Sequence, residues 1–283
     1  MSRKGQWPPA PEPLPFPVAD NHCHLDWPVG DEPRSVALQL ADAAAVGVDR
    51  VVNIGCDIAT ARWTAAAVLE HPSMLGGVAL HPNDAPEHVD GTHETGLGYE
   101  EAFAEIARLA TGERIRVIGE TGLDYFRTGP EGREAQLRSF RDHIALAKEL
   151  GKPLQIHDRD AHSDVLDVLD RDGAPEQTVF HCFSGDAGMA RLCVDRGYYL
   201  SFAGTVTFKN SHELRAALSV TPLGRVLVET DAPFLTPHPH RGAPNSPYLV
   251  PLTMLTIADV TGVTLEVACE SVSETSNSLY GPW

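Results

Sequence analysis

Eight short apolar runs rich in β-branched residues constrain the fold more than any other feature of the chain. They are FPVAD (16–20), RVVNIGC (50–56), LGGVALH (75–81), IRVIGE (115–120), PLQIH (153–157), TVFHC (178–182), YYLSF (198–202) and RVLVETD (225–231). Near-continuous hydrophobicity of this kind is typical of parallel strands that are covered on both faces. The runs therefore predict eight strands of a parallel sheet.

The stretches between these runs have helical periodicity. In the clearest one, 134–150, Leu137, Phe140 and Ile144 keep one face apolar, and Gly151 follows as a C-terminal stop. Eight strand-then-helix units in 283 residues predict an α/β fold, a single (β/α)8 TIM barrel. A doubly wound sheet is disfavoured because its usual glycine fingerprint does not follow the first strand.

The domain organisation is simple. Residues 1–16 form a proline-rich N-terminal arm without the apolar core of a secretory signal, and residues 17–283 form one barrel domain with no dividing linker. Two longer connections, 82–98 and 232–247, follow the third and eighth strands. In a barrel, loops at these positions lie on the catalytic face.

Composition excludes several classes of protein. Acidic residues outnumber basic ones 39 to 22, and the net charge of −17 argues against a broad, non-specific grip on nucleic acid. No apolar run approaches the roughly 18 residues that a membrane span needs, so we expect a cytoplasmic protein without membrane association. Five cysteines without a C-x-x-C pair argue against a disulfide framework and a thiolate zinc site. We interpret them as small buried residues.

Metal-ligating residue types gather where the predicted strands end. They are His22, His24, His81, Glu120, His157, His181, Glu229 and Asp231. Residues i and i+2 of a strand point to one face, so His22 and His24 could bind one ion. Alone, this H-x-H pair is weak support, because 13 histidines produce such pairs by chance, and 238–240 is another.

The carboxylates strengthen the case. Glu120 closes a buried run, where an ionised side chain is costly unless it is paired or coordinated. Glu229 and Asp231 are also i and i+2, and their mutual repulsion calls for a nearby cation. A helix cap or a surface loop explains any one acid equally well. The recurrence at six strand ends favours a shared site.

The number of ligands predicts two ions. Six candidates exceed what one four-coordinate ion with an open water position needs, and these are His22, His24, Glu120, His157, His181 and Asp231. We expect Glu120 to bridge the two ions. Mixed imidazole and carboxylate ligands admit zinc, manganese, iron, cobalt or, less readily, magnesium.

A pair of divalent ions activates water, so the expected chemistry is hydrolysis. Asp231 is the candidate general base, and Glu120, His81 and Glu229 complete the candidate catalytic set. Cys182 beside His181 lacks the surroundings of a hydrolase nucleophile elbow. A further set of basic residues follows the strands. Scattered surface charges are their ordinary explanation, but we favour phosphate binding, since arginine matches phosphate geometry: Arg127, Arg159, Lys209 and Arg241.

At these residues the chain resembles the TatD family of metal-dependent hydrolases. The motifs are, in order, DNHCHLD (20–26), ALHPNDA (79–85), IGETGLDYFR (118–127), LQIHDRDA (154–161), FHCFSG (180–185), GTVTFKN (204–210) and VETDAPFLTPHPHRGAPNSP (228–247). The resemblance implies His22, His24, Glu120 and Asp231 around one ion, with Glu120, His157 and His181 around the other. Asn21 and Asp158 depart slightly from the family pattern.

The resemblance also implies exonucleolytic cleavage of DNA. Some similar enzymes act instead on D-aminoacyl-tRNA, so acyl or amide hydrolysis is the alternative. A non-catalytic metal-binding protein is a third reading, disfavoured because a purely structural site is expected to close its coordination shell. The partner we expect is a nucleic acid substrate, DNA or else aminoacyl-tRNA, with no membrane and no stable protein partner.

Overall fold

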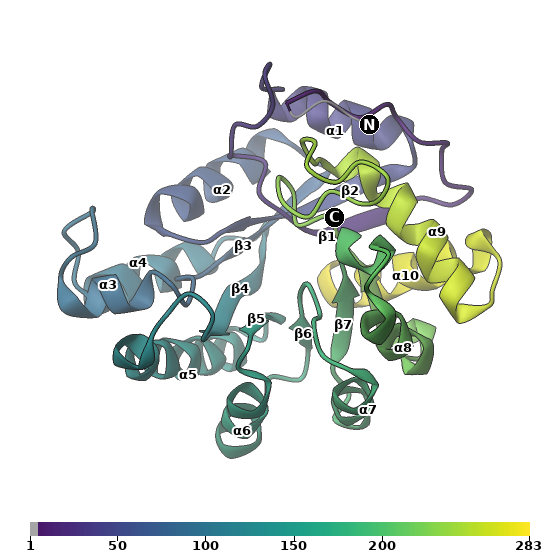
Figure 1. The fold of residues 1–283 in the computed structure, drawn as a ribbon. Helices are drawn as coiled ribbons and strands as arrows, with labels where there is room; N and C mark the ends of the chain where they lie inside the picture. The colour runs from purple at the N-terminus through teal and green to yellow at the C-terminus, as the bar shows by residue number, and fades with distance from the viewer. Residues whose placement is uncertain (1–4) are drawn as a thin grey trace. The chain divides into compact units, whose positions relative to one another are not determined.

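The computed structural model describes residues 5–283, in which eight parallel strands alternate with helices (Figure 1). The strands are β1 Val18–Cys23, β2 Val48–Gly55, β3 Met74–Val78, β4 Ile115–Asp124, β5 Leu154–Arg159, β6 Thr178–Phe180, β7 Tyr199–Phe202 and β8 Val226–Val228. They follow one another in the sheet in chain order. The predicted (β/α)8 barrel is confirmed.

Helices follow the strands as the periodicity predicted. The α-helices in this part of the chain are α1 Val36–Ala45, α2 Ile58–Glu70, α3 Ala85–Asp90, α4 Tyr99–Ala110, α5 Arg133–Leu150, α6 His162–Asp172, α7 Ala187–Asp195, α8 His212–Val220, α9 Val250–Thr261 and α10 Leu265–Tyr280. Short 3-10 helices are η1 Pro130–Gly132, η2 Gly204–Thr207, η3 Leu223–Arg225 and η4 Pro247–Leu249. Helix α5 matches the predicted 134–150 and ends at Gly151, which has a left-handed φ of 61°. The connection 82–98, predicted as a loop, contains α3.

Two compact units can be distinguished. The first unit comprises the chain up to Asn53, His71–Leu75 and Cys182–Trp283, and the second comprises Ile54–Glu70 and Gly76–His181. In the first unit, β1 pairs with β2, β7 pairs with β8, and Cys23 bridges to Ala232 beyond β8. In the second unit, β4 pairs with both β3 and β5, and β5 pairs with β6.

Strand β1 lies further along the chain than the apolar run 16–20 predicted. All six of its residues are buried, including Asp20, Asn21 and His22. Hydrogen bonds make this burial tolerable. Asp20 accepts from the backbone N–H of Thr230 at 3.0 Å and from its hydroxyl at 2.5 Å, and Asn21 donates to Ser201 at 3.0 Å. Burial raises the pKa of Asp20 to about 7, although the Thr230 hydrogen bonds oppose the rise.

Strand β4 runs past Glu120, where the sequence predicted its end, and continues to Asp124. Its register with β5 shifts between Ile118 and Thr121. Gly122 allows the two strands to approach closely, because a Cβ atom there would lie 2.1 Å from the carbonyl oxygen of His157 and its φ is 141°. The predicted strand ended too early because this polar, glycine-containing segment lacks an apolar pattern.

The proline-rich arm, as far as residues 5–16 describe it, packs on the first unit. Leu14 donates its backbone N–H to the carbonyl of Val46 at 3.0 Å, and the Tyr248 hydroxyl donates to the carbonyl of Pro8 at 2.7 Å. The guanidinium of Arg34 lies 4.4 Å from the centroid of the Trp7 ring. Residues 1–4 of the predicted arm lie outside the described residues.

Among residues 5–283, no single helix is both long and apolar enough to cross a membrane. The segments Pro247–Thr261 and Leu265–Tyr280 reach that length and composition only together, and a bend of 108° separates them.

Candidate metal centre

Three donor atoms of the first unit converge beside the end of β1. His22 Nε2 and His24 Nε2 are 3.3 Å apart, and Asp231 Oδ1 lies 3.9 Å and 3.5 Å from them, respectively. His22 is fully buried and His24 is 6% exposed. The two rings meet edge to face, with an interplanar angle of 79°. One cation could contact all three side chains.

Backbone hydrogen bonds hold this group together. Asp231 donates its N–H to the carbonyl of His22 at 3.0 Å, and His24 donates its N–H to the carbonyl of Ala232 at 2.7 Å. Asp231 has a φ of 54°, which is uncommon for a residue other than glycine. A strained backbone at this position is consistent with a functional site, where such conformations concentrate.

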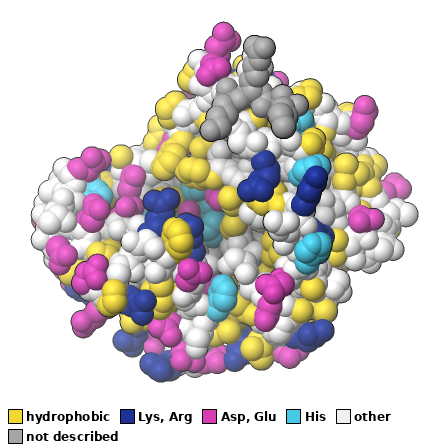
Figure 2. All heavy atoms as spheres, in the orientation of Figure 1, with side chains coloured by type: hydrophobic (Ala, Val, Ile, Leu, Met, Phe, Trp, Pro, Cys, Tyr) yellow, Lys and Arg dark blue, Asp and Glu magenta, His cyan; other side chains and the backbone are white. Residues whose placement is uncertain are grey.

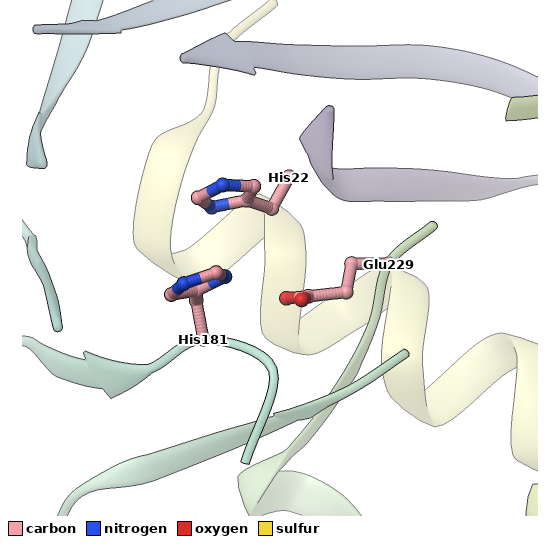
Figure 3. Close-up of side chains that lie close together, drawn as sticks. All are labelled: His22, His181 and Glu229. Carbon is pink, nitrogen blue, oxygen red and sulfur yellow. The ribbon is translucent and has the colours of Figure 1, made fainter. Parts of the chain in front are cut away.

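Glu229 lies beside the same cluster. It is fully buried, and its Oε1 accepts a hydrogen bond from the backbone N–H of Cys182 at 2.8 Å. A carboxylate oxygen of Glu229 lies within 4.8 Å of a ring nitrogen of His22, and Figure 3 shows both side chains extending into the same space. The prediction that Glu229 and Asp231 share one face of a strand was wrong, because β8 ends at Val228 and strand alternation does not extend to these acids.

In the second unit, Glu120 is the centre of a group of histidines. Its Oε2 lies 2.8 Å from His157 Nδ1, 2.8 Å from His181 Nε2 and 3.6 Å from His81 Nε2. Glu120 is 4% exposed. Burial alone would raise the pKa of its carboxyl, but His181, His81 and His157 together hold that pKa well below its usual range. Glu120 is therefore a buried carboxylate surrounded by imidazoles.

His81 is held as a neutral ring. Its Nδ1 accepts from the backbone N–H of Asn83 at 3.1 Å, which leaves the proton on Nε2, the nitrogen that faces Glu120. Burial lowers the pKa of His81 to about 3, against the opposing effect of Glu120. The ring can therefore donate a hydrogen bond at neutral pH.

Asp124 is a participant that the sequence did not reveal. Its Oδ2 lies 3.3 Å from His157 Nε2 and accepts from the amide of Asn83 at 3.1 Å. Its Oδ1 accepts the backbone N–H groups of Phe126 and Arg127 at 3.0 and 2.9 Å. Burial would raise its pKa, yet the hydrogen bonds from His157, Arg127 and Asn83 lower it below the ordinary value. In the sequence, only its position could have pointed to Asp124: it is an acid four residues after Glu120, in the polar segment that follows the apolar run.

Cys56 is a second neighbour of Glu120 for which the sequence predicted only a small buried residue. It follows β2 directly, is partly exposed, and its Sγ donates to Glu120 Oε1 at 3.3 Å. The interpretation of the cysteines as small buried residues holds for Cys23, Cys193 and Cys269, whereas Cys56 and Cys182 are partly exposed. No disulfide links any of the five cysteines within residues 5–283.

The donors fit a divalent metal. His22, His24 and Asp231 place one ligand atom each within 4.8 Å of one another. In the second unit, Glu120 Oε2 lies 2.8 Å from both His157 Nδ1 and His181 Nε2, which are 3.5 Å apart. Imidazole nitrogens mixed with carboxylate oxygens suit zinc, manganese, iron or cobalt. Buried carboxylates are costly in the absence of such partners, so the chemistry of both groups agrees with metal binding.

The four predicted phosphate-binding residues divide between the units. In the second unit, Arg127 is exposed and Arg159 lies over the Phe126 ring, 3.9 Å from its centroid. In the first unit, Lys209 is exposed and Arg241 lies 4.1 Å from the centroid of the Phe208 ring. On the face drawn in Figure 2, Lys and Arg side chains are interspersed with acidic ones. Phosphate binding by these residues stays a prediction.

Two exposed aromatic side chains, at positions with no distinguishing sequence pattern, lie next to His24. Trp27 and Phe234 are 46% and 43% exposed. Their ring centroids are 5.1 Å apart with an interplanar angle of 77°, and they lie 6.3 Å and 6.2 Å from the His24 ring. The metal-ligand candidates of the first unit therefore have an aromatic neighbour that is open to solvent.

Comparison with known proteins agrees with this chemistry. The pattern of the TatD related DNase family matches residues 19–281. The chain is 41% identical to the "Uncharacterized metal-dependent hydrolase TatD" of Mycobacterium tuberculosis over 268 residues, 93% of this chain and 98% of that protein. It is 35% identical to the "Uncharacterized metal-dependent hydrolase YcfH" of Escherichia coli over 264 residues, covering 93% and 95%.

A solved structure shares the fold. The crystal structure of YJJV, a TatD homologue from Escherichia coli, superposes with a TM-score of 0.83 at 23% identity, covering 94% of this chain and 98% of that one. Together with the imidazole and carboxylate groups, these matches establish that the chain is a metal-dependent hydrolase of the TatD family.

Proposed function

We propose that this hydrolase is a deoxyribonuclease that uses two divalent ions to cleave phosphodiester bonds from an end of DNA. The observation that carries the proposal is the donor set. His22, His24 and Asp231 converge in one unit, and Glu120, His157 and His181 converge in the other. The resemblance to the family implies that Glu120 takes part in both ligand sets.

Divalent ions, when bound, lower the pKa of a coordinated water and polarise a phosphoryl oxygen. Asp231 is then the general base. Its side chain is 14% exposed, whereas that of His22 beside it is fully buried, so the Asp231 carboxylate is open to a water molecule. It takes the proton of the attacking water and holds it on a carboxylate oxygen.

The other candidate residues bind the phosphate or set the local charge around it. The His81 ring carries its proton on Nε2, and its side chain is 16% exposed, so it can donate to an anionic phosphate oxygen. Glu229 accepts the backbone N–H of Cys182, and its carboxylate lies within 4.8 Å of a His22 ring nitrogen, so its negative charge favours a cation at His22. Arg127, Arg159, Lys209 and Arg241 would supply local positive charge on a chain whose net charge is −17.

The test uses protein stripped with a chelator and reloaded with zinc, manganese, iron(II), cobalt or magnesium separately. Single-stranded and duplex oligonucleotides carry a label at either the 5′ or the 3′ end. We expect release of mononucleotides from one end. Asp231→Asn should slow this release by about a hundredfold to ten-thousandfold because the base is lost. Asp195→Asn, an exposed acid on α7, is the matched control and should retain full activity.

Two results would overturn the proposal: no nucleotide release with any of the five metals, or equal rates for Asp231→Asn and the wild type. The alternative is hydrolysis of D-aminoacyl-tRNA or another acyl or amide bond by the same residues. The net charge of −17 disfavours a broad hold on DNA and on tRNA alike, so it supports this alternative only for a small acyl or amide substrate. The same metal-loaded preparation is therefore assayed in parallel for release of D-amino acid from aminoacyl-tRNA. Faster turnover of that substrate would favour the alternative.

A further inference from the structure

We infer that Trp27 and Phe234 form a binding site for a nucleobase beside the metal-ligand candidates of the first unit. The inference rests on the proposed nuclease function and extends it by assigning the place of the base next to the phosphate that is attacked. Both residues lie in the first unit, Trp27 just after β1 and Phe234 after β8.

The backbone hydrogen bonds that position Phe234 also connect it to the metal-ligand candidate Asp231. Phe234 donates its backbone N–H to the carbonyl of Asp231 at 2.8 Å, and its own carbonyl accepts from the buried amide of Asn245 at 2.5 Å. Asn245 also donates to the carbonyl of Thr230 at 3.0 Å. The position of the Phe234 ring is therefore fixed relative to the carboxylate that we propose as general base.

The geometry of the pair suits a planar ligand. The two rings meet nearly at right angles, at 77°, so a flat group can stack on the face of one ring and meet the edge of the other. Both side chains are nearly half exposed, at 46% and 43%. Exposed aromatic side chains are the platforms on which bases stack in proteins that bind single-stranded nucleic acid.

A nucleobase is the planar group that a phosphodiester substrate brings to this place. Only the sugar separates a base from its own phosphate, and the two rings lie 6.3 Å and 6.2 Å from the ring of His24. A phosphate bound to an ion at His22, His24 and Asp231 would therefore carry its base to Trp27 and Phe234. Stacking on aromatic side chains accepts every base, because every base has a π-face.

The main competing explanation is that the pair only shields His24 from water. Shielding predicts that truncation weakens metal binding, whereas base stacking predicts that it weakens substrate binding and leaves metal content unchanged. The experiment must therefore measure both quantities.

The variants are Trp27→Ala, Phe234→Ala and the conservative Trp27→Phe, with Leu192→Ala as control because Leu192 is a 47% exposed apolar residue on α7. Each is assayed on a labelled oligonucleotide whose terminal nucleotide carries a base and on one whose terminal nucleotide is abasic. We expect Trp27→Ala and Phe234→Ala to raise KM about tenfold on the normal oligonucleotide, with kcat within about threefold. On the abasic oligonucleotide they should match the wild type. Trp27→Phe should restore most of the loss, and Leu192→Ala should change nothing.

Two further measurements separate the failure of this site from the failure of the nuclease proposal. Metal content by mass spectrometry should be equal in all variants. In zinc-loaded protein, dAMP, which has no phosphodiester bond to be cleaved, should quench the part of the tryptophan fluorescence that Trp27→Phe removes. Active nuclease with unchanged KM in both alanine variants, or equal losses on normal and abasic ends, overturns the base site alone. If the alanine variants contain less metal, and excess metal restores both the metal content and KM, shielding of His24 is supported. This result also overturns the base site. If no oligonucleotide is cleaved, the nuclease proposal fails, and absence of quenching by dAMP then refutes the base site independently.

Discussion

The Nε2 atom of His157 lies 3.3 Å from Oδ2 of Asp124, a carboxylate that is only 1% exposed. The opposite ring nitrogen, Nδ1, faces Glu120 at 2.8 Å. Asp124 therefore keeps the proton of the neutral ring on Nε2 and leaves Nδ1 available as a metal ligand. Burial tends to lower the pKa of His157, but hydrogen bonds to Asp124 and Glu120 raise it. A carboxylate behind a ligating histidine is a common device for fixing the ring.

This arrangement predicts that Asp124→Asn weakens metal binding about tenfold to a hundredfold, because the amide no longer fixes the ring through a charged acceptor. Calorimetric titration of stripped protein with zinc measures the change. Asp164→Asn is the matched control, because Asp164 is an exposed acid that accepts a hydrogen bond from Tyr125. Equal affinity of Asp124→Asn and the wild type would show that His157 needs no such support.

Metal binding should stabilise the fold. Ligands that bind only the native state raise stability by about 2.7 kcal/mol at a hundredfold excess over Kd. We expect chelation to lower the melting temperature of the wild type and readdition of metal to restore it. The shift should shrink in His24→Ala. His238→Ala, from the other H-x-H pair and outside the candidate metal groups of the described chain, should keep the full shift. Identical shifts in both variants would contradict the assignment of His24.

Acid should destabilise the second unit through His143. This histidine is fully buried on α5, accepts the backbone N–H of Leu80 at Nε2 (3.2 Å) and lies 2.7 Å from the carbonyl of Ser139 at Nδ1. Burial lowers its pKa from 6.5 to about 4. The folded state therefore disfavours the charged ring, and stability falls as the pH drops below 6.5 toward 4. The full effect is about 3 kcal/mol.

Urea unfolding between pH 7 and pH 4 measures this dependence. His143→Gln removes the titrating group and should flatten the pH dependence of stability relative to the wild type, even where it lowers stability at neutral pH. His212→Gln, at an exposed position on α8, should leave the dependence intact. A wild-type profile in His143→Gln would assign the acid sensitivity to other groups.

Gly122→Ala should damage the site through the backbone. The new Cβ would lie 2.1 Å from the carbonyl oxygen of His157 at a φ of 141°, so β4 and β5 would have to separate. We expect a loss of about 3 kcal/mol or more in the free energy of unfolding, with weaker metal binding because His157 moves. At Gly224 a Cβ meets nothing within 4 Å, so Gly224→Ala should be close to neutral. Thermal and urea unfolding of both variants provides the comparison.

The sequence predicted the barrel and the candidate ligands for one reason. Hydrophobic runs mark buried parallel strands, and in a barrel the polar residues that follow them meet at one end. It ended β1 too early because Asn21 and His22 look like loop residues, although partners such as Ser201, which is 180 positions from Asn21, make this burial tolerable. Such pairings are invisible in one sequence without the fold.

The neighbours of the ligands were harder to predict than the ligands themselves. Asp124 stands in a polar segment that hydrophobic patterning assigns to a loop, and Cys56 reads as one small residue among five. Trp27 and Phe234 lie in irregular segments without periodicity, and only their distances from His24 distinguish them. These roles depend on three-dimensional proximity.

The hydrogen bond between Asp20 and Thr230 joins residues 210 positions apart, and Asp231 follows directly. During synthesis on the ribosome, where chains emerge from the N-terminus, Glu120, His157 and His181 are therefore all available before the first unit can assemble its own donors. The nascent chain acquires its two groups of candidate metal ligands in a fixed temporal order, the middle of the polypeptide first and the pairing of its two ends last.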